Sequence, residues 1–231
     1  MKLNKVLPKF KGLYFFLKRM KYKWMGWKFD QPADRIIQTA STTFFDRHPD
    51  LFKAVSELAI SNPELSILSF GSSTGEECQS LRKYFPNAHI VGAEINADSR
   101  KKAIANNADE RIQFIDSVPS KINENGPFDV VFALSVLCKN PEAEYAEDLS
   151  SIYPFATYDR MVNELHGYLK VGGWLVIRSA NYRFKDTAIY NNYQLCSPAG
   201  MREPIEFPKF NASGKKLKGF LESEEIFQKI K

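Results

Sequence analysis

The sequence predicts an α/β fold. We expect a Rossmann-like, doubly wound, mostly parallel seven-stranded sheet with helices on both faces, and an N-terminal helical extension. Three observations predict it. Apolar runs of strand length alternate with helical patterns from residue 64 onward. A turn bounded by Gly71 and Gly75 joins the first of these strands to a helix, and the acidic residues Glu94 and Asp116 end the next two strands.

Composition limits the class of protein. The chain has 231 residues, of which 44% are hydrophobic, so it can form a full core. No apolar run approaches the roughly 20 residues that a membrane-spanning helix needs, and the N-terminus has no apolar stretch of signal-peptide length. The cysteines, Cys78, Cys138 and Cys196, are too far apart for a disulfide framework or a metal site. We therefore expect reduced thiols, no bound metal and a cytoplasmic protein.

The first 30 residues form a basic, aromatic leader. Residues 1–28 contain nine Lys or Arg and no acid, although the net charge of the whole chain is only +5. One interpretation is peripheral binding of residues 1–29 to an anionic membrane surface. A nucleic-acid or anionic-substrate patch and an arm that simply covers the domain are the alternatives. Nucleic acid is the weakest of these, because no recognised nucleic-acid motif is present.

Residues 31–63 form the predicted helical segment over the ligand site. A helical pattern covers Gln31 to Ala40, and Pro49 can start a second helix with one apolar face. The stretch between them, Thr43 to His48, can fold back over the glycine turn. From composition we expect its Phe44 and Phe45 to pack in the core.

The main domain, residues 64–231, begins with the strand that enters the glycine turn. Gly71 and Gly75 permit backbone angles and close approaches that a Cβ would prevent. Unpaired N–H groups at the start of the following helix suit an anionic or polar ligand group. A turn of this kind at the carboxyl edge of a parallel sheet is a common site for nucleotide-like ligands. The candidate binding residues in the turn are Gly71, Ser72, Ser73, Thr74 and Gly75.

The next strands supply further candidates. Glu94 ends the strand His89 to Glu94 and is placed to accept both hydroxyls of a ribose, with Ile95 beside it. Asp116 and Ser117 follow the strand Arg111 to Ile115, and Asp116 is placed to accept from an adenine amino group. After the strand that ends at Leu134, the residues expected beside the ligand are Ser135 and Val136.

The second half of the chain is less regular. Residues 139–154 are an acid-rich insertion, either a lid or substrate loop or a solvated loop. A helix from Phe155 to Leu169 and a strand from Trp174 to Ile177 follow. In the tail we expect two edge strands, at Tyr190 to Cys196 and Glu206 to Phe210. A basic loop over 211–219 and a terminal helix over Leu221 to Ile230 complete the predicted order.

These motifs together resemble the class I S-adenosylmethionine-dependent methyltransferases over roughly residues 64–210. The resemblance implies that the glycine turn holds the methionine part of the cofactor, Glu94 the ribose and Asp116 the adenine, with S-adenosylhomocysteine as product. The stretch Leu68 to Glu77 is similar to the glycine motif of the chemotaxis receptor (protein-glutamate) methyltransferases. The segment Thr42 to Arg47 resembles their Thr/Phe-Phe-Arg segment, and it implies an active-site role for Arg47. The common acid two residues before the first glycine is replaced by Ser69.

The resemblance leaves the methyl acceptor open. It can be a small molecule, a lipid or glycan precursor, or a protein carboxylate, as in the receptor methyltransferases. The candidate catalytic residues are Arg47, which could orient an anionic acceptor, and Tyr153 and Tyr182, which could line the acceptor pocket. Two alternatives remain, a nicotinamide-dependent dehydrogenase and a non-catalytic, membrane-associated module that keeps the fold. The turn lacks the G-x-G-x-x-G fingerprint of the former.

Overall fold

A computed structural model describes residues 35–38, 42–59, 64–197, 205–219, 221–222 and 225–231. The chain divides into two compact units, Met1–Ile36 and Ile37–Lys231. The predicted leader, residues 1–30, lies outside the described residues. No helix in the described part of the chain is long and apolar enough to cross a membrane.

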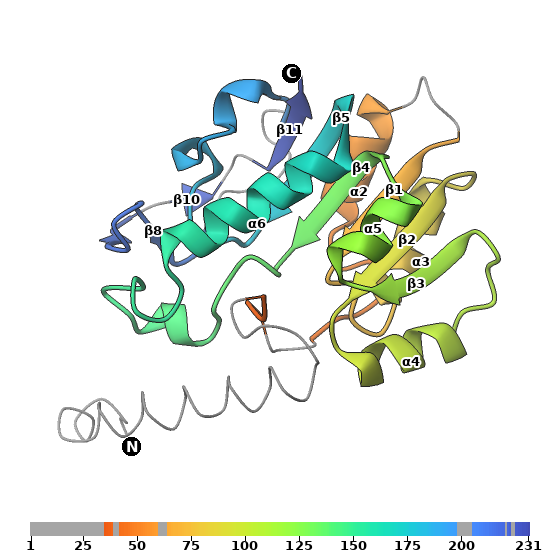
Figure 1. The fold of residues 1–231 in the computed structure, drawn as a ribbon, viewed down its shortest axis with the longest axis horizontal. Helices are drawn as coiled ribbons and strands as arrows, with labels where there is room; N and C mark the ends of the chain where they lie inside the picture. The colour runs from red at the N-terminus through yellow and green to blue at the C-terminus, as the bar shows by residue number, and fades with distance from the viewer. Residues whose placement is uncertain (1–34, 39–41, 60–63, 198–204, 220, 223–224) are drawn as a thin grey trace. The chain divides into compact units, whose positions relative to one another are not determined.

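The second unit is built on a seven-stranded sheet with helices on both faces (Figure 1). The strand order is β3-β2-β1-β4-β5-β11-β6, and the first five of these strands are parallel to one another. The antiparallel pairings are those of β11 with β5 and with β6. The predicted mostly parallel, seven-stranded, Rossmann-like fold is confirmed. The sheet consists of β1 (Ser66–Phe70), β2 (His89–Glu94), β3 (Ile112–Asp116), β4 (Phe128–Leu134), β5 (Leu169–Arg178), β6 (Tyr193–Leu195) and β11 (Ile226–Lys229).

Each face of the sheet carries its own hydrophobic core. Neighbouring residues of one strand alternate between the two cores, as Ile67 and Leu68 of β1 do, and both are fully buried. This accounts for the near-continuous apolar runs of the central strands. One core takes its helical side chains from α5 (Pro119–Asn125) and α6 (Phe155–Tyr168). The other takes them from α2 (Pro49–Leu58), α3 (Glu76–Tyr84) and α4 (Ala97–Ala105).

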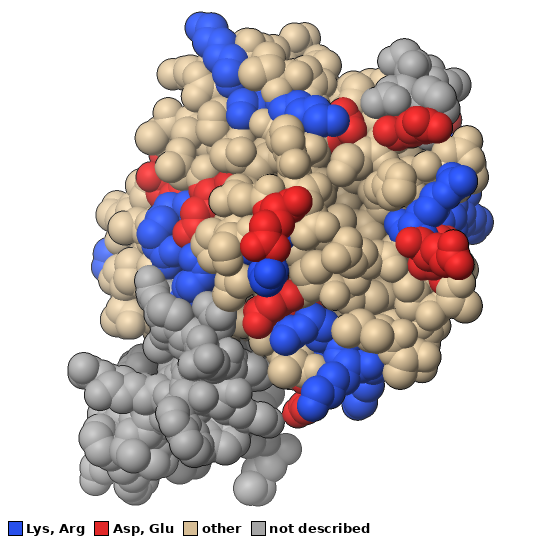
Figure 2. Space-filling model, turned by 45° about the vertical axis from the view of Figure 1, so that its right-hand side comes forward, with Lys and Arg blue, Asp and Glu red and all other residues tan. Residues whose placement is uncertain are grey.

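The remaining described elements are short. The 3-10 helices are η2 (Glu142–Glu144), η3 (Phe184–Asp186) and η4 (Tyr190–Asn192). Two small sheets pair β7 (Ile205–Glu206) with β10 (Leu221–Glu222) and β8 (Lys209–Phe210) with β9 (Lys216–Leu217). Figure 2 shows acidic and basic side chains interspersed over one face, without a broad area of one sign.

Several local predictions are wrong. The predicted terminal helix over Leu221 to Ile230 is wrong in its described residues, which contain β10 and β11, because residues 226–229 pair with β5 on one side and β6 on the other. The predicted basic loop contains β9, and α5 was not predicted. Phe44 and Phe45 are 56% and 55% exposed, and do not pack in the core.

The predicted N-terminal helix, Gln31 to Ala40, is not confirmed. Its described residues, 35–38, are not helical, and the rest of it lies outside the described residues. The second predicted helix of this segment is present as α2, which begins at Pro49.

Candidate functional site

The glycine turn follows β1 and contacts the ends of β2 and β4. Gly71 and Gly75 have φ angles of 82° and 100°, in the left-handed region that favours glycine. The amides of Gly71 and Ser72 donate to the carbonyl oxygen of Ala93 in β2, at 2.8 and 3.2 Å. A Cβ at Gly71 would collide with the side chain of Val136, which follows β4. The turn therefore needs glycine both for its backbone angle and for this close approach.

Glu94 fixes the turn from the end of β2. Its carboxylate accepts from the amide of Ser73 at 2.8 Å and from the amide of Asn96 at 2.7 Å. Only 7% of the residue is exposed. Burial raises the pKa of Glu94, and the amides of Asn96 and Ser73 oppose that shift. Each carboxylate oxygen has a second lone pair with which to accept from a ligand hydroxyl.

Asp116 lies beside Glu94, since the two residues are register partners in the β2–β3 ladder. Arg100 is close to both, with 2.7 Å from its Nη1 to the Glu94 carbonyl and 3.5 Å from its Nη2 to Asp116 Oδ2. The other oxygen of Asp116, Oδ1, is buried and has no hydrogen-bond partner among the described residues. Ser72 Oγ is in the same condition. Buried acceptors without partners are rare in folded proteins, so both atoms are candidates for ligand contacts.

Arg47 reaches the same edge from the segment before α2. Its Nη2 donates to Ser135 Oγ at 2.9 Å, and its Nη1 donates to the carbonyl of Thr42 at 2.8 Å. The neighbouring Asp46 anchors the segment to α3, accepting from the Tyr84 hydroxyl at 2.8 Å and donating its amide to Ser80 Oγ at 2.7 Å. The segment from Thr42 to His48 is therefore held between α3 and the end of β4. Arg47 and Ser135 were predicted separately, and the structure brings them into contact.

Glu77 is a residue that the sequence reasoning missed. Its Oε1 accepts from Ser69 Oγ at 2.7 Å, so the position that is commonly acidic in this motif hydrogen-bonds to a carboxylate from α3. Burial raises the pKa of Glu77 to about 7, although the Ser69 hydroxyl and the Arg47 guanidinium lower it in part. The signal was present in the sequence, because Glu77 follows Gly75 by only two positions.

Tyr153 and Tyr182 do not reach this edge as exposed groups. They are 1% and 0% exposed, and the Tyr182 hydroxyl donates to the carbonyl of Tyr153 at 2.5 Å. Their rings pack 5.6 Å apart in an aromatic cluster with Phe155 and Tyr158. Both rings are therefore part of the core packing, while the buried Tyr153 hydroxyl has no hydrogen-bond partner among the described residues.

The edge as a whole suits an adenosyl cofactor with an amino-acid end. Two acidic strand ends provide acceptors for hydroxyl and amino groups, and the turn allows close approach of the backbone. Arg47 and Glu77 add opposite charges that match a carboxylate and an ammonium group. Among the described residues, no group of three or more His, Cys, Asp or Glu side chains is placed to hold a metal ion.

Comparison with solved structures finds methyltransferases, at low similarity. The plantazolicin methyltransferase BpumL in complex with S-adenosylhomocysteine is 16% identical, with a TM-score of 0.41, and the match covers 55% of this chain and 44% of that one. Human N-acetylserotonin methyltransferase in complex with S-adenosylmethionine is 14% identical, with a TM-score of 0.41 and coverage of 56% and 32%. A putative caffeoyl-CoA O-methyltransferase from Staphylococcus aureus is 14% identical, with a TM-score of 0.40 and coverage of 58% of each chain.

The match to the first of these structures spans less than half of its length. No curated protein sequence matches this chain. A protein-family model, described as a methyltransferase domain, does match residues 44–213, which is most of the chain and contains the candidate residues from Arg47 to Tyr182. The chain therefore belongs to the methyltransferase domain family.

Proposed function

We propose that this chain transfers the methyl group of S-adenosylmethionine to an acceptor that binds beside the ends of β4 and β5. The observation that carries the proposal is the convergence of the glycine turn, Glu94 and Asp116 at one edge of the sheet. The acceptor can be a small molecule, a lipid or glycan precursor, or a protein carboxylate.

The residues of this edge divide the work of binding. Glu94 would accept from the ribose hydroxyls and Asp116 Oδ1 from the adenine amino group. Glu77 and Arg47 would hold the ammonium and carboxylate groups of the methionine end. The carboxylate of Glu77 is attracted by the charge of Arg47 and accepts a hydrogen bond from the Ser69 hydroxyl. Its position is therefore fixed before the ligand binds.

Catalysis then depends mainly on alignment. S-adenosylmethionine, when bound, supplies a methyl group on a sulfonium sulfur, already activated for transfer. The chain's task is to hold the acceptor atom in line and to exclude water. A carboxylate acceptor needs no base, whereas a hydroxyl or amine acceptor must lose a proton. Ser135 and Val136, which directly follow β4, would lie beside the acceptor during this step.

Binding of S-adenosylhomocysteine, measured by calorimetry from pH 6 to 8, tests this proposal. A Glu77 carboxyl with a pKa of about 7 is largely protonated at pH 6 and ionised at pH 8. Because only the ionised form attracts the ligand's ammonium group, affinity is expected to rise with pH, by up to about tenfold per pH unit below the pKa. Glu77→Gln should bind more weakly and with a flatter pH dependence over this range.

Glu77→Gln leaves Arg47 and the neighbouring His48 in place, whose Nε2 accepts from Arg47 Nε at 3.0 Å. The difference between the wild type and Glu77→Gln isolates the carboxyl from that histidine. A folded wild-type protein that binds no S-adenosylhomocysteine at any pH would refute the proposed function.

Three other experimental results would each support a different function. Labelled methyl transfer to protein glutamate would support the receptor-methyltransferase alternative. Saturable binding of NAD in place of S-adenosylhomocysteine would support a dehydrogenase. Binding of the cofactor without transfer to any acceptor in a broad screen would support a non-catalytic module.

We also propose that residues 1–29 bind an anionic membrane surface. Their basic and aromatic composition supports this. We expect the full chain to sediment with phosphatidylserine-containing vesicles and to be released by salt. A chain without residues 1–29 should bind at least about tenfold more weakly, because its basic and aromatic leader is gone. Equal sedimentation with purely neutral vesicles would contradict the proposal.

A further inference from the structure

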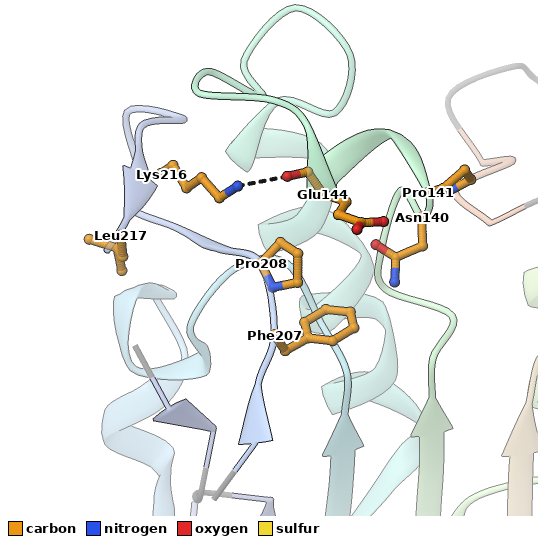
Figure 3. A pocket seen from close by; sticks show the side chains of 7 residues that line it. All are labelled: Asn140, Pro141, Glu144, Phe207, Pro208, Lys216 and Leu217. Atoms are coloured by element: carbon orange, nitrogen blue, oxygen red, sulfur yellow. Dashed lines mark hydrogen bonds between the residues drawn. The ribbon is translucent and has the colours of Figure 1, made fainter. Parts of the chain in front are cut away.

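A cavity of about 600 Å³ lies beyond the carboxyl ends of β4 and β5 (Figure 3). It is lined by residues of the insertion that follows β4 and by residues around β8 and β9. None of these residues belongs to the glycine turn or to the acidic strand ends. The lining residues are Asn140, Pro141, Glu144, Phe207, Pro208, Lys216 and Leu217.

Backbone hydrogen bonds tie the two walls of the cavity together. The amide of Leu149 donates to the carbonyl of Gly214 at 2.8 Å, and the amide of Lys216 donates to the carbonyl of Glu147 at 3.0 Å. An ion pair of 2.8 Å between Lys215 and Asp148 adds to them. The insertion over residues 139–154 is therefore a fixed wall of the cavity rather than a free lid.

Asn181, which follows β5, joins both walls to the end of the sheet. Its Oδ1 accepts from the amide of Lys139 at 2.6 Å, and its Nδ2 donates to the carbonyl of Pro208 at 2.9 Å. Its own amide donates to the carbonyl of Leu137 at 3.1 Å. The loop that carries Ser135 at the candidate cofactor edge thus continues directly into the cavity wall at Asn140.

The lining of the cavity combines apolar surfaces with a few polar groups. Phe207, Pro141 and Pro208 provide flat apolar surfaces, which suit a ring. Asn140 Oδ1 is buried and has no hydrogen-bond partner among the described residues, so it can accept from a ligand hydroxyl. The cavity has one acidic and one basic side chain, Glu144 and Lys216, and the ammonium group of the latter donates to the Glu144 carbonyl at 2.8 Å. An ionic ligand would therefore meet a side chain of its own sign beside one of the opposite sign.

We propose that this cavity holds the methyl acceptor, and that the acceptor is an uncharged ring compound carrying hydroxyl groups. The inference rests on the proposed function, because it assigns the acceptor of that same reaction. The volume lies within the range typical of small-molecule sites. Sugars and phenols are both uncharged rings with hydroxyl groups, and this is the feature that the cavity lining fits.

The test is saturation-transfer NMR on the full chain saturated with S-adenosylhomocysteine. The probes are methyl glucoside and catechol, each paired with a charged counterpart, glucose 6-phosphate and benzoate. We expect at least one neutral probe to bind in preference to its charged counterpart, and the responding probe distinguishes a sugar from a phenol. Asn140→Leu should weaken that binding about tenfold, equal to about 1.4 kcal/mol, without changing the affinity for S-adenosylhomocysteine.

Tyr145→Ser is the matched control, since Tyr145 lies in the same insertion, is 74% exposed and does not line the cavity. It should change neither affinity. The inference is overturned if S-adenosylhomocysteine binds but no neutral probe does, if the charged probes bind as well, or if Asn140→Leu leaves probe binding unchanged. A chain that binds no S-adenosylhomocysteine is a failure of the proposed function instead, so the two results are separable.

Discussion

Replacing Glu94 with alanine is expected to lower the affinity for S-adenosylhomocysteine by at least about 100-fold, equal to about 2.8 kcal/mol. The variant loses two things at once. The carboxylate no longer offers acceptors to the ribose hydroxyls, and hydrogen bonds to a charged group are typically worth about 1.5–3 kcal/mol each. The glycine turn also loses the 2.8 Å hydrogen bond from the Ser73 amide to this carboxylate, so only the bonds of Gly71 and Ser72 to Ala93 still hold it to β2.

Two control variants sharpen this experiment. Glu94→Gln keeps one acceptor oxygen and the shape of the side chain, and should lose affinity to an intermediate degree, about tenfold. Glu110→Ala removes an exposed acid before β3 and should bind as the wild type does. Calorimetry supplies the affinities and circular dichroism confirms that each variant is folded. Unchanged binding by a folded Glu94→Ala protein would remove the ribose-binding role of this carboxylate.

Arg178→Met is expected to destabilise the fold by about 3–5 kcal/mol, the largest single effect on stability that we predict. Arg178 ends β5, and its side chain is only 4% exposed. Its guanidinium donates to both oxygens of Glu225 at 2.7 Å, and to those of Asp50 at 3.2 and 2.9 Å. Since the Glu225 side chain is 0% exposed, removing the arginine leaves a fully buried carboxylate without its counter-ion.

The expected fall in melting temperature is roughly 10 °C for a chain of this size. Arg183→Ala is the matched control, because it breaks a more exposed arginine pair, with Asp186, and should cost less than about 1 kcal/mol. Adding Glu225→Gln to Arg178→Met should recover part of the loss, since the buried charge is removed. Urea denaturation measures all three variants. A loss below about 1 kcal/mol for Arg178→Met would show that the network contributes specificity rather than stability.

Arg178 also links this network to the candidate site. Its Nη1 lies 3.1 Å from His48 Nδ1, and the other nitrogen of that ring accepts from Arg47. The carbonyl of Arg178 accepts from the amide of Ser135 at 2.8 Å. The stabilising network and the segment that carries Arg47 therefore meet at one histidine, so Arg178→Met should also be assayed for cofactor binding.

The central sheet and the cofactor edge could be predicted because their signals are local. A buried parallel strand is a short apolar run, and the turn after β1 requires glycine at positions that adjoin that run. Glu94 ends the predicted second strand and Asp116 directly follows the predicted third, and the carboxyl ends of parallel strands share one edge of the sheet. Sequence order alone was enough to bring these acids beside the glycine turn.

The tail could not be predicted in the same way. Residues 226–229 become a strand only because β5 and β6 offer edges for antiparallel pairing on either side of them. Their short apolar and polar pattern is compatible with a helix, and nothing within the segment records its neighbours. The same limit applies to Phe44 and Phe45, whose exposure depends on how Asp46 and Arg47 anchor the segment around them.

The sequence by itself determined the doubly wound fold, the glycine turn and the acidic strand ends, because each is encoded by residues close together in the chain. Only the tertiary structure decided which distant side chains meet. Arg47 contacts Ser135 across 88 positions, Glu225 compensates Arg178 across 47, and the walls of the cavity at Asn140 and Lys216 come from separate segments. The physical reason is that such contacts are selected by the packing of the whole fold, which buries or exposes a side chain independently of its neighbours in sequence.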